Sequence, residues 1–336
     1  MAVMRAVRLH FPTHTLTVDE VARPEPGRDQ VLVRVAAAGV CLSDVHLIDG
    51  TLTPLNRASD TVILGHEVSG TVAELGPGVS GWQPGDRVVL QAVEKRDGAT
   101  WTRGVNYDGG WAEYALARVE ALCRVPESIA LDQAAIIPDA VSTPWGAITT
   151  TGRVRPAEAV GVWGVGGLGA HAVQLLRAVG AYPVVAVDPV PAARERALAF
   201  GADLALDPAD PELPALIAAL TGRAGLAVAF DFAGVPAVRE QALEVLAPRG
   251  RLVLVGLTDQ PLTVIAGTRF TFLQQQILGH YASDETAVPQ LLGLASGGRL
   301  DFSRSISDVL PLERAAEAVE RLQKKQGAPI RLLLRP

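Results

Sequence analysis

The first third of the chain alternates between apolar and polar positions with a period of two. The stretches Met4 to Leu9 and Gln30 to Val35 follow this pattern closely. Further short strand-like runs recur at Val62 to Leu64, Gly70 to Glu74 and Arg87 to Val89, separated by turns rich in proline and glycine. Strands this short and this closely spaced predict an antiparallel, barrel-like β domain.

From about Leu131 the pattern changes to strands that alternate with helices. Strand-like runs are expected at residues 159–163, 182–188, 203–206, 226–230, 252–255 and 276–279, and helical runs at 168–179, 192–200, 214–220 and 238–246. This alternation predicts a doubly wound parallel sheet of six strands. The tail adds a helix at about 312–323 and a strand at 330–334, which we expect to return to the first domain. The predicted domains are therefore 1–145, 146–285 and the returning segment 286–336.

A glycine-rich turn joins the first strand of the predicted sheet to its first helix. Gly164, Gly166 and Gly169 have the G-x-G-x-x-G spacing, with Val165, Gly167 and Leu168 between them. Such a turn brings backbone N–H groups and a helix N-terminus to a pyrophosphate. Asp188 ends the next strand, where a carboxylate accepts hydrogen bonds from ribose hydroxyls. The context predicts dinucleotide binding; the alternative is a purely structural turn.

Composition narrows the range of partners. The chain has 336 residues and a net charge of -6, which argues against a nucleic-acid or anionic-membrane surface and favours small molecules. We find no transmembrane run and no signal peptide, so we expect a cytoplasmic protein that spans no membrane. Cys41 and Cys123 are the two cysteines, and a disulfide between them is not expected in that compartment. Cys123 is interpreted as a buried free thiol.

Two residues of the β domain are candidate metal ligands. Cys41 lies in Gly39-Val40-Cys41-Leu42-Ser43-Asp44-Val45-His46, and His66 lies in Gly65-His66-Glu67-Val68-Ser69-Gly70. Thiolate and imidazole are the usual zinc ligands, and a catalytic zinc site needs three protein ligands and an open position.

The segment Gly65-His66-Glu67-x-x-Gly70, followed by Gly76, Val79 and Gly85-Asp86-Arg87-Val88, resembles the zinc signature of the medium-chain, zinc-dependent alcohol dehydrogenases. The resemblance covers nearly the whole chain. It implies a GroES-like antiparallel β-barrel catalytic domain plus a Rossmann domain that binds a nicotinamide cofactor. It also implies that Cys41 and His66 bind a catalytic zinc and that Glu67 lies beside it.

Two departures from the family pattern matter. The position of the third catalytic ligand, often a cysteine, is Asp139 here, which is similar to the secondary-alcohol dehydrogenases of the family. A carboxylate is an acceptable zinc ligand, although Asp139 could instead cap a helix. Residues 91–107 contain no cysteine where many members bind a second, structural zinc, so one zinc per subunit is expected.

The resemblance assigns the remaining site residues. Ser43 and His46 correspond to the proton relay, with the cofactor ribose between them. The cofactor would also be flanked by Thr143, Phe232, Ala233, Val255, Gly256, Leu257, Gly279 and His280. Asp188 favours NAD over NADP because its charge repels the additional phosphate, a preference that Arg194 weakens. Trp101, Tyr107 and Trp145 are candidates for the substrate pocket, although each could equally be a packing residue.

The expected function is oxidation of an alcohol to a ketone or aldehyde by hydride transfer. The expected substrate is a medium-sized, apolar secondary alcohol. A polyol or amino-alcohol dehydrogenase on the same scaffold is an alternative. A zinc-free reductase fits less well because Cys41, His66 and Glu67 are all present. A further alternative is a non-catalytic protein that binds a nucleotide. We further expect a homodimer or homotetramer.

Overall fold

The structure is a computed structural model that describes residues 2–96 and 98–336. The chain divides into two compact units. Unit 1 consists of Met1–Ser142 and Asp284–Pro336, and unit 2 consists of Thr143–Ser283. In the described residues no helix has both the length and the apolar character needed to cross a membrane.

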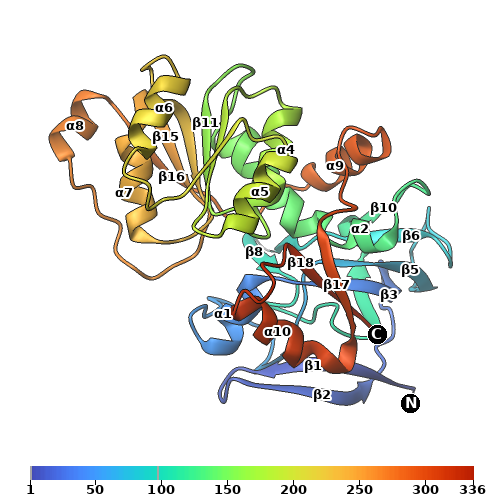
Figure 1. The fold of residues 1–336 in the computed structure, drawn as a ribbon. Helices are drawn as coiled ribbons and strands as arrows, with labels where there is room; N and C mark the ends of the chain where they lie inside the picture. The colour runs from blue at the N-terminus through green and yellow to red at the C-terminus, as the bar shows by residue number, and fades with distance from the viewer. Residues whose placement is uncertain (1, 97) are drawn as a thin grey trace. The chain divides into compact units, whose positions relative to one another are not determined.

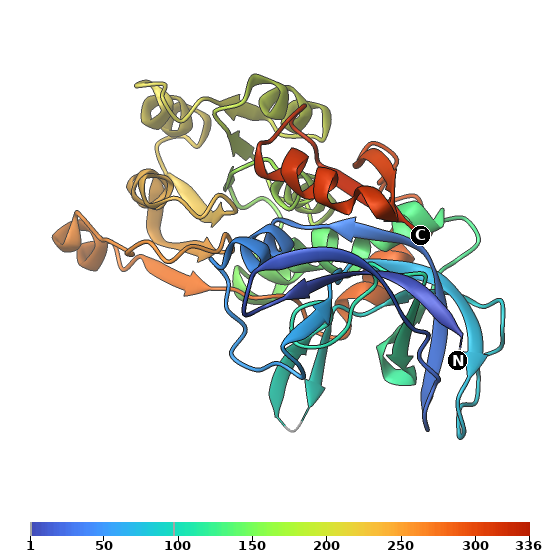
Figure 2. The same cartoon turned by 90° about the horizontal axis from the view of Figure 1, so that it is seen from below.

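Unit 1 is built mainly from antiparallel strands. Its strands are β1 (Val3–His10), β2 (Thr15–Ala22), β3 (Gln30–Val40), β4 (Thr61–Ile63), β5 (Val68–Leu75), β6 (Arg87–Leu90), β7 (Val93–Arg96), β8 (Ala99–Thr102), β9 (Tyr114–Arg118), β10 (Leu122–Arg124), β17 (Ile306–Pro311) and β18 (Arg331–Arg335). The largest sheet has the order β10-β6-β5-β3-β18-β17, with β9 also paired to β3. A second sheet has the order β2-β1-β4, and β7 pairs with β8 in a hairpin. Figures 1 and 2 show β1 and β2 as adjacent dark-blue strands.

The C-terminal tail completes the large sheet of unit 1. Strand β18 pairs antiparallel with β3, so Leu332 lies opposite Val40 near the point where β3 ends. The helical segments of unit 1 are α1 (Leu42–Asp49), η1 (Val119–Ala121), α2 (Leu131–Ala135), η2 (Ile137–Val141), α9 (Ala287–Ser296), η4 (Leu312–Arg314) and α10 (Ala315–Gln323). Helix α10 packs against α1, so the tail supports the helix that follows Cys41.

Apolar side chains from the sheets of unit 1 form one core. The alternation along β1 buries Met4, Ala6 and Leu9, as the period of two predicts. Trp111 is fully buried and donates its indole N–H to the carbonyl of Gly39 at 2.9 Å. Burial of side chains of this size contributes about 1.5–3 kcal/mol each. The core therefore fixes the end of β3, from which Cys41 emerges.

Unit 2 is a six-stranded, entirely parallel sheet. Its strands are β11 (Val160–Trp163), β12 (Val184–Val187), β13 (Leu204–Leu206), β14 (Leu226–Asp231), β15 (Leu246–Leu254) and β16 (Gln276–Gly279). The strand order is β13-β12-β11-β14-β15-β16. The chain adds β12 and β13 on one side of β11 and then β14, β15 and β16 on the other side, as in a doubly wound dinucleotide-binding fold. Every residue of β11 and β12 is buried, which explains their continuous apolar sequences. The predicted fold class is confirmed.

Helices cover both faces of this sheet. They are α3 (Ser142–Gly146), η3 (Ala147–Thr151), α4 (Gly169–Ala178), α5 (Pro191–Ala199), α6 (Leu213–Leu220), α7 (Pro236–Glu244) and α8 (Gly267–Phe272), of which α3 begins at the last residue of unit 1. In Figure 1 the strands lie between α4 and α5 on one side and α6 and α7 on the other. The helix predicted at 238–246 was wrong at its end, because Leu246 is already the first residue of β15 and pairs with Leu226.

Candidate functional site

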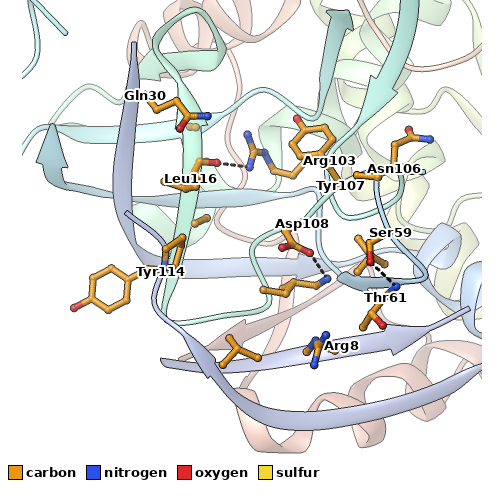
Figure 3. Close-up of a pocket in the computed structure, with 18 of the residues that line it drawn as sticks. Arg8, Gln30, Ser59, Thr61, Arg103, Asn106, Tyr107, Asp108, Tyr114 and Leu116 are labelled. Atoms are coloured by element: carbon orange, nitrogen blue, oxygen red, sulfur yellow. Dashed lines mark hydrogen bonds between the residues drawn. The ribbon is translucent and has the colours of Figure 1, made fainter. Parts of the chain in front are cut away.

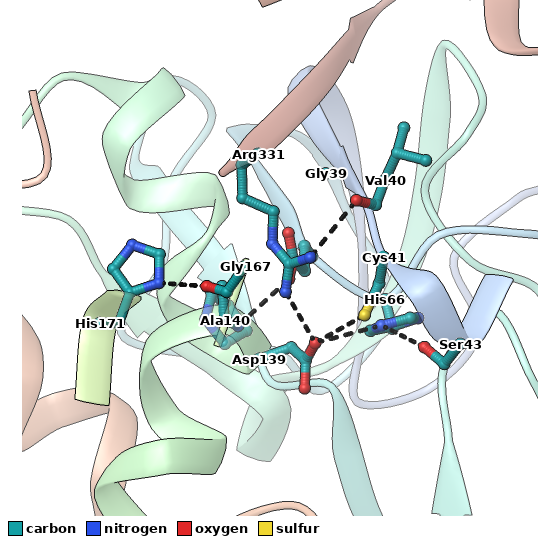
Figure 4. A network of polar contacts seen from close by, with 12 residues as sticks. Gly39, Val40, Cys41, Ser43, His66, Asp139, Ala140, Gly167, His171 and Arg331 are labelled. Atoms are coloured by element: carbon teal, nitrogen blue, oxygen red, sulfur yellow. Dashed lines mark hydrogen bonds and ion pairs between the residues drawn. The ribbon is translucent and has the colours of Figure 1, made fainter. Parts of the chain in front are cut away.

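Four potential ligand side chains converge at one place in unit 1. The nearest ligand atoms of Cys41, His66, Glu67 and Asp139 all lie within 4.8 Å of one another. Cys41 follows β3, and His66 and Glu67 lie between β4 and β5. Asp139 is the third residue of η2, a short π-helix. Figure 4 shows Cys41, His66 and Asp139 directed toward one another.

The distances in this cluster fit a metal ion. Asp139 Oδ2 lies 3.3 Å from Cys41 Sγ and 3.4 Å from His66 Nε2. Ligand bonds of 2.0–2.3 Å in a tetrahedral zinc site separate the ligand atoms by about 3.3–3.8 Å. Thiolate, imidazole and carboxylate are all accepted zinc ligands. We therefore call Cys41, His66, Glu67 and Asp139 the metal cluster.

A buried carboxylate lies behind the imidazole of His66. Asp44 Oδ1 is 3.5 Å from His66 Nδ1, and neither atom has a hydrogen-bond partner in the described residues although they are at ion-pair distance. The other oxygen of Asp44 accepts a hydrogen bond of 2.9 Å from the Cys41 backbone N–H. A ring whose Nδ1 carries the proton and faces a carboxylate presents an unprotonated Nε2 to a metal. Asp44 thus holds the backbone at Cys41 and places a carboxylate beside the ring of His66.

The electrostatics of the metal cluster favour a bound cation. Burial opposes charge on His66, yet Asp44 and Asp139 raise its pKa well above the ordinary value. Burial raises the pKa of Glu67 to about 8, although nearby Arg331 opposes this rise. Three carboxylates thus lie around a single imidazole at a site shielded from water. A metal ion would take the place of the proton that His66 otherwise holds.

Arg331 of β18 partly balances these negative charges. Its side chain is buried, with Nη2 located 2.9 Å from Glu67 Oε1 and 3.5 Å from Asp139 Oδ2. Glu67 Oε1 also accepts the backbone N–H of Ala140 at 3.1 Å. Sequence reasoning missed both Arg331 and Asp44. Signals existed, since Arg331 interrupts an apolar strand and Asp44 lies three residues after Cys41.

The structure places the two predicted relay residues on α1. Ser43 Oγ lies 3.3 Å from His66 Nε2, so this hydroxyl is directly beside the metal cluster. His46 lies in the last turn of the same helix, with Nδ1 at 4.0 Å from Asp49 Oδ2. Both side chains are on one short helix, but a relay between them stays a prediction.

The glycine-rich turn of unit 2 has the geometry of a phosphate-binding loop. Gly164 has a positive φ of 87°, and a Cβ on Gly169 would lie 1.8 Å from the carbonyl oxygen of Gly164. A Cβ on Gly166 would meet no protein atom within 4 Å. Protein packing therefore requires glycine at position 169 but not at position 166. Open space at Gly166 fits the approach of a ligand to the backbone.

Asp188 at the end of β12 holds this turn in place. Its Oδ2 accepts the backbone N–H of Val165 at 2.7 Å, and its Oδ1 accepts that of Val190 at 2.8 Å. Arg194 donates to the Asp188 carbonyl at 2.7 Å and pairs with Asp207 at 2.9 Å. Gly167 and Leu168 precede α4, and the Gly167 carbonyl lies 2.6 Å from His171 Nδ1 (Figure 4).

The other predicted cofactor residues follow the carboxyl ends of the neighbouring strands. Phe232 and Ala233 follow β14, and Ala233 lies next to Gly164. Val255, Gly256 and Leu257 follow β15, and the backbone N–H groups of the first two bond to the Asp231 carbonyl. Gly279 ends β16, and His280 Nε2 lies 3.0 Å from the Thr143 carbonyl. Ligands of open parallel sheets bind at this edge.

The three candidates for the substrate pocket belong to different units, Trp101 and Tyr107 to unit 1 and Trp145 to unit 2. Tyr107 donates its hydroxyl to Glu94 Oε1 at 2.5 Å, and the Arg96 guanidinium lies 3.9 Å from its ring centroid. The same guanidinium lies 5.3 Å from the ring centroid of Trp101 in β8. Trp145 belongs to α3 in unit 2. Trp101 and Tyr107 therefore face a charged cluster, and their role in substrate binding stays a prediction.

Two family models match the chain. The alcohol dehydrogenase GroES-like domain matches residues 27–127, and the zinc-binding dehydrogenase domain matches residues 167–297. The first region contains Cys41, His66 and Glu67, and the second contains the end of the glycine-rich turn and Asp188.

Individual relatives cover most of the chain. An alcohol dehydrogenase from Geobacillus stearothermophilus is 31% identical over 93% of this chain and 94% of its own length. An L-threonine 3-dehydrogenase from Pyrococcus horikoshii is 31% identical over 82% of each chain. The crystal structure of the alcohol dehydrogenase from Aeropyrum pernix matches with a TM-score of 0.86 and 29% identity, covering 99% of this chain and 100% of that one.

Proposed function

This chain belongs to the family of zinc-dependent alcohol dehydrogenases, and we propose that it oxidises a medium-sized secondary alcohol to a ketone with NAD. The observation that carries the proposal is the convergence of Cys41, His66 and Asp139 within zinc-ligand distance of one another. Aspartate as the third donor favours a secondary alcohol, because the chain resembles the secondary-alcohol members at this position.

The residues of unit 1 have distinct parts in this proposal. Cys41, His66 and Asp139 would hold zinc, and Glu67, paired with Arg331 at 2.9 Å, would stay close to it. When bound, zinc polarises an alcohol or carbonyl oxygen, and the nicotinamide exchanges hydride with the adjoining carbon. Ser43, whose Oγ is 3.3 Å from His66 Nε2, would accept the proton of a substrate hydroxyl. His46 would pass this proton to solvent.

Unit 2 would bind the dinucleotide. The turn Gly164 to Gly169 would hold the pyrophosphate at the N-terminus of α4, where backbone N–H groups and the helix dipole favour anions. Asp188 would accept the ribose hydroxyls and disfavour the additional phosphate of NADP. Arg194 is already engaged by Asp207 and the Asp188 carbonyl, which reduces its capacity to hold that phosphate.

An amino-alcohol or polyol substrate is the second candidate. It is favoured by the 31% identity to the L-threonine 3-dehydrogenase of Pyrococcus horikoshii. A polar substrate would need polar groups around the metal cluster, whereas an apolar alcohol would not. The predicted homodimer or homotetramer and the predicted cytoplasmic location stay predictions.

A panel of alcohols distinguishes these candidates. Zinc-replete protein with NAD would be offered ethanol, butan-2-ol, butane-2,3-diol and L-threonine, with absorbance of NADH as the readout. We expect the highest kcat/KM with butan-2-ol. A clear preference for L-threonine or the diol would establish the second candidate, and NADP in parallel reactions tests the cofactor preference.

A further inference from the structure

Unit 1 contains a pocket of about 650 Å³ that is separate from the metal cluster. It lies among β1, β4, β9 and residues of the stretches 94–96 and 103–109. Cys41, His66, Glu67 and Asp139 are not among its lining residues. Figure 3 shows Arg103, Tyr107 and Asp108 around it. We call it the Arg103 pocket, after the buried arginine in its wall. None of the residues proposed to hold zinc or the dinucleotide lines it, although Tyr107, a predicted substrate-pocket residue, does.

Arg103 is an unusual residue to find in such a wall. Its side chain is only 1% exposed. Nη1 donates to the Leu116 carbonyl at 2.8 Å, and Nη2 lies 3.4 Å from Glu94 Oε1. Nε has no hydrogen-bond partner among the described residues. A buried cation with an unused donor is costly unless a partner completes it.

The carboxylate of Glu94 is shared too widely to neutralise this site. Besides Arg103, Glu94 contacts Arg96 Nη2 at 3.2 Å and accepts the Tyr107 hydroxyl at 2.5 Å. Among the described residues, two guanidinium groups and a phenol therefore share the one carboxylate of Glu94, so neither arginine has that carboxylate to itself. Arg96 also stacks on the Tyr107 ring. This arrangement holds the two guanidinium groups in fixed positions.

The other charged groups that line the pocket are already engaged or exposed. Arg8 pairs with Asp19 at 3.3 Å, and Arg118 pairs with Glu120 at 3.5 Å. Asp108 is exposed and accepts the backbone N–H of Ile63 at 2.9 Å. The guanidinium groups of Arg96 and Arg103 thus lie together in one part of the wall and share the Glu94 carboxylate.

We propose that the Arg103 pocket binds a small organic carboxylate with an apolar body, independently of the metal cluster. Guanidinium groups match carboxylates in charge and planar geometry. The same pocket is lined by Met4, Val62 and Ile63, which suit a hydrocarbon portion. Its volume lies in the range of small-molecule sites.

The test is calorimetric titration of the zinc-loaded protein with hexanoate, with hexanamide and inorganic phosphate as comparison probes. Hexanoate is expected to bind, hexanamide at least about tenfold more weakly because it lacks the charge, and phosphate more weakly because it lacks the apolar body. Equal binding of hexanoate and hexanamide would overturn the proposal. Phosphate binding as tightly as hexanoate would also overturn it, because the pocket would then recognise charge alone.

Two variants with opposite expected effects on hexanoate affinity locate the site. Arg96→Gln should weaken hexanoate binding about tenfold, and Glu94→Gln should strengthen it by removing the competing carboxylate. Arg118→Gln is the matched control and should leave binding unchanged, because Arg118 is paired elsewhere. Arg96→Gln and Glu94→Gln each replace a charged side chain with an uncharged polar one. Melting temperatures verify that both variants fold. Changes of the same sign in Arg96→Gln and Glu94→Gln would contradict the proposal.

A metal-site control excludes hexanoate bound at zinc. Cys41→Ala removes a zinc ligand and should retain hexanoate binding, because the Arg103 pocket does not include Cys41. Loss of binding in Cys41→Ala together with unchanged binding in Arg96→Gln would place the carboxylate at the metal and refute the proposal.

Discussion

At the scale of single residues, Asp139 connects the metal cluster. One oxygen of its carboxylate is within 3.5 Å of Cys41 Sγ, His66 Nε2 and Arg331 Nη2. Three groups of different chemistry rarely meet at one carboxylate oxygen by packing alone, because burial of each polar group is costly. The position inside η2, rather than at a helix cap, is consistent with the π-turns that often occur at functional sites.

Asp139→Ala should therefore lose zinc and activity together. Removal of a ligand leaves Cys41 and His66, and we expect zinc affinity to fall by at least about a hundredfold, more than a change in an outer-shell partner causes. Asp139→Cys should retain zinc, because thiolate is a competent ligand, with altered activity. Bound zinc and melting temperature measured on both variants decide the matter. Full zinc occupancy in the alanine variant would transfer the role of third ligand to Glu67 or water.

Cys123 should be almost inert toward alkylation. Burial in β10 raises the pKa of its thiol to about 11, so the protonated form persists in the folded protein at pH 8. Because thiolate is the reactive form, Cys123 should react with iodoacetamide roughly a hundredfold more slowly than in the unfolded chain. The rate should rise as the pH rises toward 11. Peptide mapping by mass spectrometry measures this rate, and equal rates in folded and urea-unfolded protein would refute the assignment.

At the scale of elements, the turn between β11 and α4 depends on Asp188. One oxygen of this carboxylate accepts the backbone N–H of Val165 in the glycine-rich turn, and the other accepts that of Val190, which follows β12. A residue predicted to bind ribose thus also fixes the loop that would bind phosphate. Both tasks are possible because a carboxylate has about four acceptor positions.

Asp188→Ser should raise the KM for NAD by about tenfold or more and improve the use of NADP relative to NAD. It removes the ribose acceptor, the charge repulsion and part of the support of the turn at once. Asp188→Asn is the matched control, because it keeps the size and one acceptor while it removes the charge. Steady-state kinetics with both cofactors measure the effect. If the unchanged protein already prefers NADP, the interpretation of Asp188 is wrong.

The elements that could be predicted from sequence were those with a strong local pattern. The strand expected at 276–279 is β16, and the helix expected at 192–200 differs from α5 by one residue at each end. The hairpin β7–β8 was not predicted, because each of its strands has only four residues and Val93–Arg96 carries three charged residues in succession. Asp44 and Arg331 were missed for a different reason, since their partners are distant in sequence or depend on the packing of β18 against β3. The metal cluster was predictable only because motif spacing marks Cys41 and His66.

At the scale of the whole molecule, the two units have different chemistry. Unit 1 contains the metal cluster, with Arg331 from the C-terminal tail as part of its surroundings. Unit 2 contains the glycine-rich turn and Asp188. The tail therefore has a direct part in the site, because β18 brings a buried cation to Glu67 and Asp139.

The most direct measurement is NADH formation from butan-2-ol with zinc content determined on the same samples. The unchanged protein should contain about one zinc per subunit and reduce NAD, and Cys41→Ala should lose both the zinc and the activity. Circular dichroism spectra of the two proteins should match, which separates loss of zinc from loss of fold. Two tightly held zinc ions per subunit, or an unchanged rate of NADH formation in zinc-free Cys41→Ala, would contradict a single catalytic zinc at Cys41, His66 and Asp139.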